Sequence, residues 1–177
     1  MSLLSSQPTN LNYLSPLGFK FTMNRTPILS YFTQSVNAPN LTLGLTSIST
    51  PFSNIPLPGD KLTFADFTVV FRVDEDMKSW QEVYDWMYGL GHPDNFEQYS
   101  TVAPSRDPNA AAGSVGPFSD ASLVILSSAS NPIMSVNFTD VFPTSLSDLT
   151  FDSRGSTVDY IECTATFAYR KYELIRL

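Results

Sequence analysis

The chain of 177 residues is long enough for one domain with a substantial hydrophobic core. Its net charge of −7 argues against binding to a nucleic-acid backbone, because such binding needs clustered Lys and Arg side chains. One cysteine excludes both a disulfide framework within the chain and a cysteine metal cluster. Aromatic residues (13%) nearly match charged residues (15%), and this composition favours a mainly β protein with many turns.

The first 16 residues are small and polar, and they predict an N-terminal arm ahead of a single domain over residues 17–177. The arm lacks the basic region and apolar run of a secretory signal, and no apolar run in the chain reaches the length of a membrane span. We therefore expect synthesis in a cytoplasm and no membrane partner. Apolar residues of the arm that are expected to contact a neighbouring subunit are Leu3, Leu4, Leu11 and Tyr13.

Three strands are predicted after the arm, over residues 18–25, 29–36 and 41–46. Apolar and polar residues alternate in the first and the third, as in strands with one buried face. Residues 47–60 contain three prolines and are expected to form a long loop, of a kind that is usually functional or disordered. Its apolar side chains predict burial, either against a neighbouring subunit or against its own domain. The residues assigned to an interface in this loop are Phe52, Ile55, Leu57, Pro58 and Asp60.

A central strand is predicted where Phe67, Val69 and Phe71 face one way. Apolar residues upstream occupy the opposite parity, and this switch predicts a β-bulge at residues 65–66.

A helix is expected over residues 75–90, because Asp74 can cap its first turn and apolar residues recur at helical spacing. Glycines and Pro93 provide its stop signal. Trp86 falls at the flank of the apolar stripe. The stripe consists of Met77, Trp80, Val83, Tyr84, Met87 and Leu90.

The second half of the chain opens with a long connection over residues 92–118, rich in Pro and Ala and expected to be a surface excursion. Strands at residues 120–127 and 134–138 then predict a β-hairpin. Residues 140–150 are expected to form a connector with apolar anchors.

The last strand is predicted around residues 161–170, after a second bulge near Tyr160. Cys163 lies in its apolar row, so a buried and inert thiol is expected. Residues 171–177 are predicted to be a short tail.

The sequence contains few residues or motifs that could support catalysis. His92 is the only histidine, which excludes a two-histidine metal site, and its Gly-His-Pro-Asp context is that of a solvated turn. No Ser lies in a nucleophile elbow, and no glycine-rich phosphate loop occurs. Carboxylate pairs fall at cap or turn positions, where a structural role suffices. We therefore expect no catalytic, metal or cofactor site and no enzymatic activity.

Two blocks of sequence carry a family resemblance. The first, PGDKLTFADFTVVFRVDED at residues 58–76, is followed by Trp80 and the predicted helix. The second, FTDVFPTSLSDLTFD at residues 138–152, precedes the last strand. Over roughly residues 19–172, this order of motifs resembles the tail tube proteins of contractile-tailed bacteriophages of the T4 type. Residues 91–118 have no counterpart that we recognise in those tube proteins.

The resemblance implies a β-barrel or sandwich of antiparallel strands with one flanking helix. It further implies hexameric rings that stack into the tail tube of a virion. Double-stranded DNA and a tape-measure protein would pass through the lumen, and an acidic wall suits a duct that does not retain DNA. The implied partners are copies of the chain, the tail sheath, the tape-measure protein and baseplate or neck proteins.

The resemblance also assigns roles to three segments. The loop at 47–60 and the arm at 1–16 become candidates for contacts between rings. The outer face of the helix becomes a candidate for sheath contact, with residues Lys78, Glu82, Asp85 and Trp86.

Several functions remain open from the sequence. The main tube subunit is the first interpretation, because the chain is one short domain. A tube initiator, a tube terminator and a baseplate-proximal ring protein are alternatives of the same fold. A type VI secretion or extracellular injection tube shares the architecture. A monomeric β-sandwich binding module would instead require exposed aromatic residues on one concave face.

Overall fold

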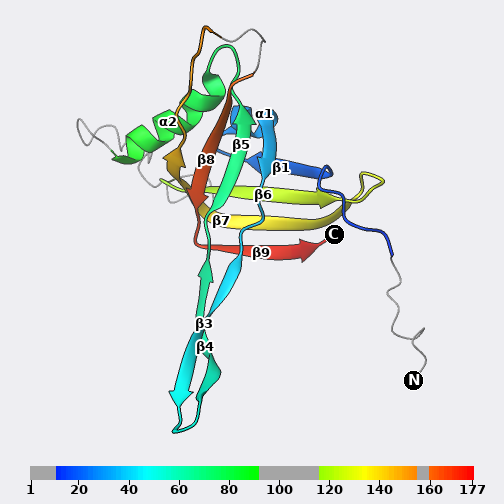
Figure 1. Cartoon of the computed structure of the whole chain (residues 1–177). Helices are drawn as coiled ribbons and strands as arrows, with labels where there is room; N and C mark the ends of the chain where they lie inside the picture. The colour runs from blue at the N-terminus through cyan, green and yellow to red at the C-terminus, as the bar shows by residue number, and fades with distance from the viewer. Residues whose placement is uncertain (1–10, 92–115, 155–159) are drawn as a thin grey trace.

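A computed structural model describes residues 11–91, 116–154 and 160–177 (Figure 1). These residues confirm a mainly β fold of antiparallel strands, and they form two helices where the sequence predicted one. In chain order the elements are β1 (Phe19–Met23), α1 (Pro27–Phe32), β2 (Thr33–Val36), β3 (Leu41–Ser49), β4 (Asn54–Phe64), β5 (Phe67–Arg72), α2 (Lys78–Gly91), β6 (Ser119–Leu126), β7 (Pro132–Leu146), β8 (Glu162–Ala168) and β9 (Lys171–Arg176).

A bent seven-stranded sheet forms the body of the protein. Its strand order is β1-β6-β7-β8-β5-β2, and β9 also pairs with β7. β7 belongs to both parts of the bend: its first half pairs with β6 and β9, and its second half pairs with β8. Asp140, between the two halves, has a φ of 56°. The strands on either side of this bend run crosswise in Figure 1, so the sheet wraps around a core.

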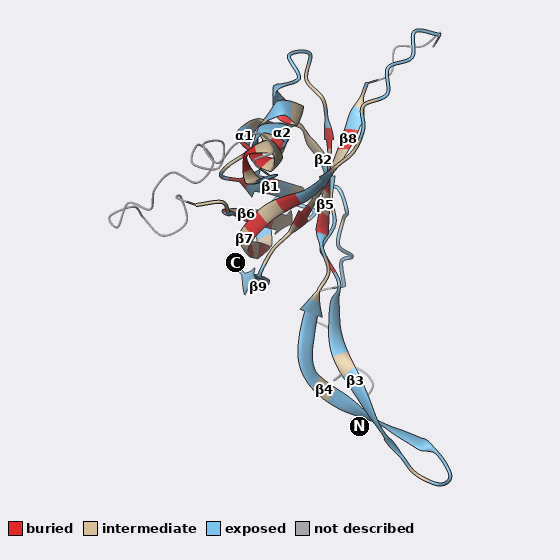
Figure 2. Cartoon of the chain, turned by 90° about the vertical axis from the view of Figure 1, so that its left-hand side faces the viewer, coloured by how far each residue is buried: buried red, intermediate tan, exposed pale blue. Residues whose placement is uncertain are grey.

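Aromatic rings fill this core. Phe67 is fully buried, and its ring stacks on Phe138 with centroids 4.5 Å apart and on Phe167 at 5.3 Å. Its alternate neighbours Val69 and Phe71 are fully buried too, which confirms the predicted face of the central strand. Fully burying each such side chain contributes about 1.5–3 kcal/mol. The red segments of Figure 2 follow these strands.

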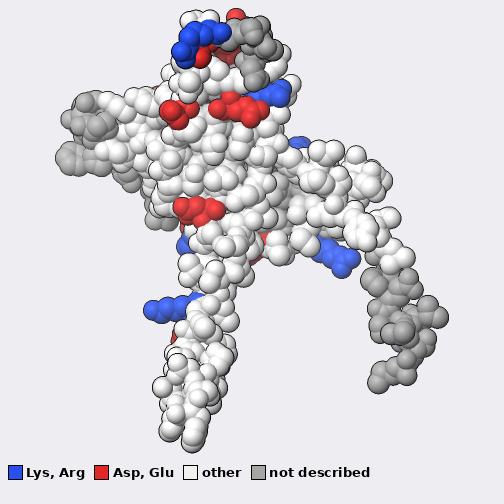
Figure 3. All heavy atoms as spheres, viewed as in Figure 1, with Lys and Arg blue, Asp and Glu red and all other residues white. Residues whose placement is uncertain are grey.

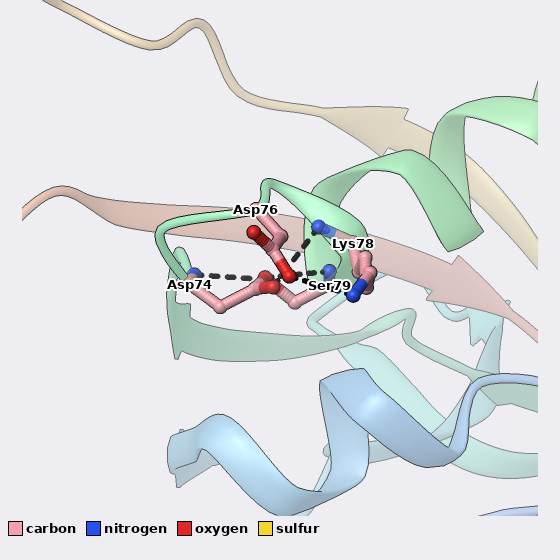
Figure 4. Close-up of polar contacts among 4 residues, drawn as sticks. All are labelled: Asp74, Asp76, Lys78 and Ser79. Carbon is pink, nitrogen blue, oxygen red and sulfur yellow. Dashed lines mark hydrogen bonds and ion pairs between the residues drawn. The ribbon is translucent and has the colours of Figure 1, made fainter.

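Asp74 caps α2, as the sequence predicted (Figure 4). Its carboxylate accepts hydrogen bonds from the amides of Lys78 (3.1 Å) and Ser79 (2.8 Å) and from the Ser79 hydroxyl (2.6 Å). Desolvation opposes ionisation of Asp74, but these hydrogen bonds hold its pKa below the ordinary value. The helix begins at Lys78, later than predicted, because residues 75–76 form a turn and Met77 takes a φ of 57°.

The strand predicted over residues 29–36 is wrong in its first half, which forms α1. Pro27 supplies a φ suited to the first helical turn. The carboxylate of Glu82, on α2, accepts hydrogen bonds from the amides of Ile28 (3.1 Å) and Leu29 (3.2 Å). A carboxylate more than 50 residues away thus satisfies the free donors of α1, and no local pattern announces it.

The loop predicted over residues 47–60 is also wrong. These residues belong to a β-hairpin of β3 and β4, with the turn at residues 50–53. The predicted bulge at residues 65–66 is a break between two strands, because β4 ends at Phe64 and β5 begins at Phe67. Strand β4 tolerates its prolines because the hairpin is a two-stranded sheet with open edges.

Two further expectations near the C-terminus are corrected. The connector predicted over residues 140–150 is largely strand, since β7 continues to Leu146 to pair with β8. The tail predicted over residues 171–177 is mostly β9, which pairs with β7. Cys163 is buried and unoxidised, as expected, and burial raises the pKa of its thiol.

Other expectations fall outside the described residues: Leu3 and Leu4 of the arm, His92, and nearly all of the connection at 92–118. Among the described residues, neither helix has the length and apolar character of a membrane span. Within the same ranges, no group of three His, Cys, Asp or Glu side chains is arranged to hold a metal ion.

Candidate subunit interface

The β3–β4 hairpin projects from the body as a separate two-stranded sheet (Figure 1). It is exposed along almost its whole length, as the pale blue ribbon of Figure 2 shows. A polar surface would be expected at such a position, but the hairpin carries many large apolar side chains. Those that are at least 37% exposed are Leu41, Leu43, Leu45, Ile48, Phe52, Ile55, Leu57 and Leu62.

The strand register places these side chains on both faces of the hairpin. Leu43 lies opposite Leu62 and shares its face, whereas Ile48 lies opposite Ile55. Because Leu43 and Ile48 differ in parity along β3, the two pairs occupy opposite faces. Phe52 extends from the tip and is 99% exposed. A ribbon with apolar groups on both faces suits enclosure by other chains rather than packing on one flat surface.

Two glycines hold the strands of the hairpin close together. The register shifts between Leu43 and Leu45, at the place where Gly44 and Gly59 meet. A Cβ at position 59 would lie 2.7 Å from the carbonyl oxygen of Gly44, which is closer than backbone atoms allow. Only glycine fits there, so the shape of the hairpin depends on this contact.

The hairpin is also nearly free of charge. Between Leu41 and Phe64 the only charged residues are Asp60 and Lys61. Figure 3 shows white atoms over most of the hairpin and more charged atoms at the opposite end of the molecule. At that end three exposed ion pairs join Arg72 with Glu162, Lys78 with Asp76, and Arg154 with Asp152. The two ends of the molecule are therefore chemically different.

The structure brings together five of the interface residues predicted from the sequence, since Phe52, Ile55, Leu57, Pro58 and Asp60 all lie on this hairpin. The arm residues Leu11 and Tyr13 lie apart from it, and they are 63% and 97% exposed. The sequence reasoning missed the leucines of β3. Their alternation with polar residues predicted a strand with one buried face. A strand exposed on both faces can show the same alternation, so the sequence did not distinguish the two cases.

The four helix residues proposed for sheath contact separate into two pairs. Lys78 and Asp85 are exposed. Trp86 is only 2% exposed, and its indole nitrogen donates a hydrogen bond to the carbonyl of Pro117 at 3.0 Å. The guanidinium of Arg25 lies 5.0 Å from the Trp86 ring, and burial lowers the pKa of Arg25.

Glu82, the fourth of these residues, is turned toward α1. Its partial burial raises its pKa, although the hydrogen bonds from Leu29 and Ile28 act against this shift. Trp86 and Glu82 therefore make contacts inside the molecule, and of the four predicted residues only Lys78 and Asp85 remain available for an outer contact.

Comparisons with known proteins define the type of fold. No model of a known protein family matches the sequence. The chain shares its fold with the tube-terminating cap of the anti-feeding prophage, with a TM-score of 0.65, 13% identity and full coverage of both chains. It also superposes on the sheath/tube terminator of the extracellular contractile injection system PVC, with a TM-score of 0.62, 16% identity and coverage of 94% of this chain and 99% of that one.

A relative found by sequence is also a tube terminator. The chain is 27% identical over 155 residues to the tail tube terminator protein of Enterobacteria phage T4, covering 85% of this chain and 81% of the relative. The fold is therefore of the tube type found in contractile tail-like assemblies. The sequence relative and the two structural neighbours are all named as tube terminators or caps, in agreement with the non-enzymatic function expected from the sequence.

Proposed function

We propose that the chain is a tube terminator: a protein that forms a ring and ends the tube of a contractile, phage-like tail. The similarity to the T4 tail tube terminator over most of both chains carries this proposal. It favours the terminator, which the sequence offered as an alternative, over the main tube subunit, which was the first interpretation. The structural similarity to two further terminators supports the same choice.

The β3–β4 hairpin is the proposed contact with the last ring of the tube. Apolar surface removed from water contributes about 25 cal/mol per Å², and the hairpin exposes apolar groups on both faces with almost no charge to desolvate. The opposite end carries exposed ion pairs, whose burial against another ring would be costly. One end suited to stacking and one end unsuited to it is the arrangement that a terminator needs.

The remaining partners follow from this position in a virion tail. Six copies would form the ring, the sheath would surround it, and neck proteins would lie beyond it. Double-stranded DNA would pass through the ring without specific binding, consistent with a net charge of −7. Of the four helix residues predicted for an outer contact, Lys78 and Asp85 are exposed and available to such a partner.

Electron microscopy of the purified chain tests this proposal, alone at increasing concentration and after addition of tubes from the same particle. We expect isolated rings that do not stack on one another and that bind the ends of tubes. Long tubes formed by the chain alone would identify a main tube subunit instead. Monomers at every concentration that leave tube ends bare would contradict both assignments.

A further inference from the structure

The body of the protein has an open groove at the place where its sheet fails to close. β1 and β2 are the two ends of the strand order β1-β6-β7-β8-β5-β2, so within the described part of the chain each pairs with another strand along one edge only. A groove of about 1070 Å³ lies between them, with α1 connecting the two strands. Because the unpaired edge of a strand presents N–H and C=O groups, an extended segment in this groove could pair with the sheet.

The lining of the groove limits what can fill it. Lys20 is the single charged residue among the groove's lining residues. Polar Ser, Thr and Gln side chains also line it. The occupant should therefore be extended and uncharged, with apolar side chains among polar ones. Apolar residues that line the groove include Leu14, Leu17, Phe19, Val36, Leu123 and Ile125.

The N-terminal arm is uncharged and carries apolar side chains among polar ones. Its first 17 residues contain no Lys, Arg, Asp or Glu, in a chain that has 10 basic and 17 acidic residues. Leu11 and Tyr13 are strongly exposed, and residues 11–15 form neither helix nor strand. Thirteen residues in extended form would reach about 43–47 Å.

Of the described part of the arm, only its last residues line the groove of their own chain. Residues 14–17 line the groove, whereas Leu11 and Tyr13 do not. A turn at residues 16–17 directs the arm away, and Figure 1 shows the blue chain leaving the body ahead of β1. Leu11 and Tyr13 are therefore available to another molecule.

We propose that the groove between β1 and β2 is a strand acceptor for the N-terminal arm of a second copy of this chain. The proposal rests on the ring-forming function above and adds the contact that links copies within the ring. An arm that enters the next groove is a head-to-tail contact, and such contacts close into a ring when the rotation between copies allows it. The hairpin is then left for the tube.

A disulfide experiment between full-length chains tests the acceptor. One chain carries Tyr13→Cys and the other carries Ser35→Cys, on the exposed edge of β2; the native Cys163 is buried. We expect the mixture to form a disulfide between the two chains under mild oxidation, identified by mass spectrometry of the joined peptides. A matched mixture with Asp85→Cys, exposed on α2, should not form it. Deletion of residues 2–13 should convert rings into folded monomers.

Three outcomes would overturn the acceptor. Closure of the disulfide within a single molecule, in a chain that carries both Tyr13→Cys and Ser35→Cys, would place the arm in its own groove. A disulfide between a chain with Phe52→Cys and a chain with Ser35→Cys would show that the hairpin, and not the arm, occupies the groove. If the mixture of the two cysteine variants assembles into rings but forms no disulfide between positions 13 and 35 on oxidation, the acceptor is rejected and the proposed function is left intact. Failure of the unmodified chain to form rings or bind tubes would reject the function itself.

Discussion

Two phenylalanines, Phe67 and Phe52, show how differently the body and the hairpin use the same kind of side chain. Phe67 is fully buried among stacked rings, whereas Phe52 is 99% exposed at the tip of a projecting ribbon. The body buries most of its large apolar side chains, fully or partly, within the chain, whereas the hairpin leaves its own exposed. The contrast supports the proposal that the hairpin, unlike the body, is completed by another molecule.

Removing the ring of Phe67 should have the largest effect on stability. Phe67→Ala leaves a cavity among packed aromatic rings, and such changes cost about 3–5 kcal/mol. The free energy of unfolding, measured with urea, should fall by this amount. Phe52→Ala is the matched control and should change it by less than about 0.5 kcal/mol. Equal losses for the two variants would mean that the hairpin belongs to the core.

The cap of α2 should contribute less, and its contribution should depend on pH. Asp74→Ala removes the hydrogen bonds to Lys78 and Ser79 and should cost about 1 kcal/mol at neutral pH. Because the folded pKa of Asp74 lies below its ordinary value of 3.8, the stabilisation is complete above that pH and is lost as the pH falls through the folded pKa. Thermal unfolding of both proteins from pH 7 to pH 3 measures this. A difference that persists unchanged at the lowest pH would contradict the role of the carboxylate.

The hairpin should show the smallest effect on folding and a large effect on assembly. Replacing Phe52 and Leu57 together by Ser should change the free energy of unfolding by less than about 0.5 kcal/mol, because both side chains are exposed. The variant should form rings and fail to bind tube ends in electron micrographs. Phe151→Ser, at another exposed phenylalanine, is the control and should bind normally. Normal binding by the double variant would remove the hairpin from the interface.

Local patterns predicted the parts of the fold that depend on local physics. The buried face of the central strand followed from alternation, and the cap at Asp74 followed from an acidic residue ahead of an apolar helical stripe. The errors lie where distant groups decide. α1 depends on the carboxylate of Glu82, and β9 depends on pairing with β7.

The sequence predicted the position of the candidate interface but not its structure. Apolar residues after Pro51 marked the right segment, but prolines are rare in strands, so a loop was expected where a hairpin lies. Trp86 was assigned to the outside because it sits at the flank of the helical stripe, yet its indole is held between Arg25 and the carbonyl of Pro117. Which flank of a helix is buried depends on the elements around it.

The central claim is that the hairpin is completed by the tube, and amide hydrogen exchange tests it most directly. Peptides that cover β3 and β4 are compared in free rings and in rings bound to tube ends. The account predicts slow exchange of the hairpin amides only in the bound state, with the body strands β5 and β8 protected in both. Unchanged, fast exchange of the hairpin in tube-bound rings would contradict it.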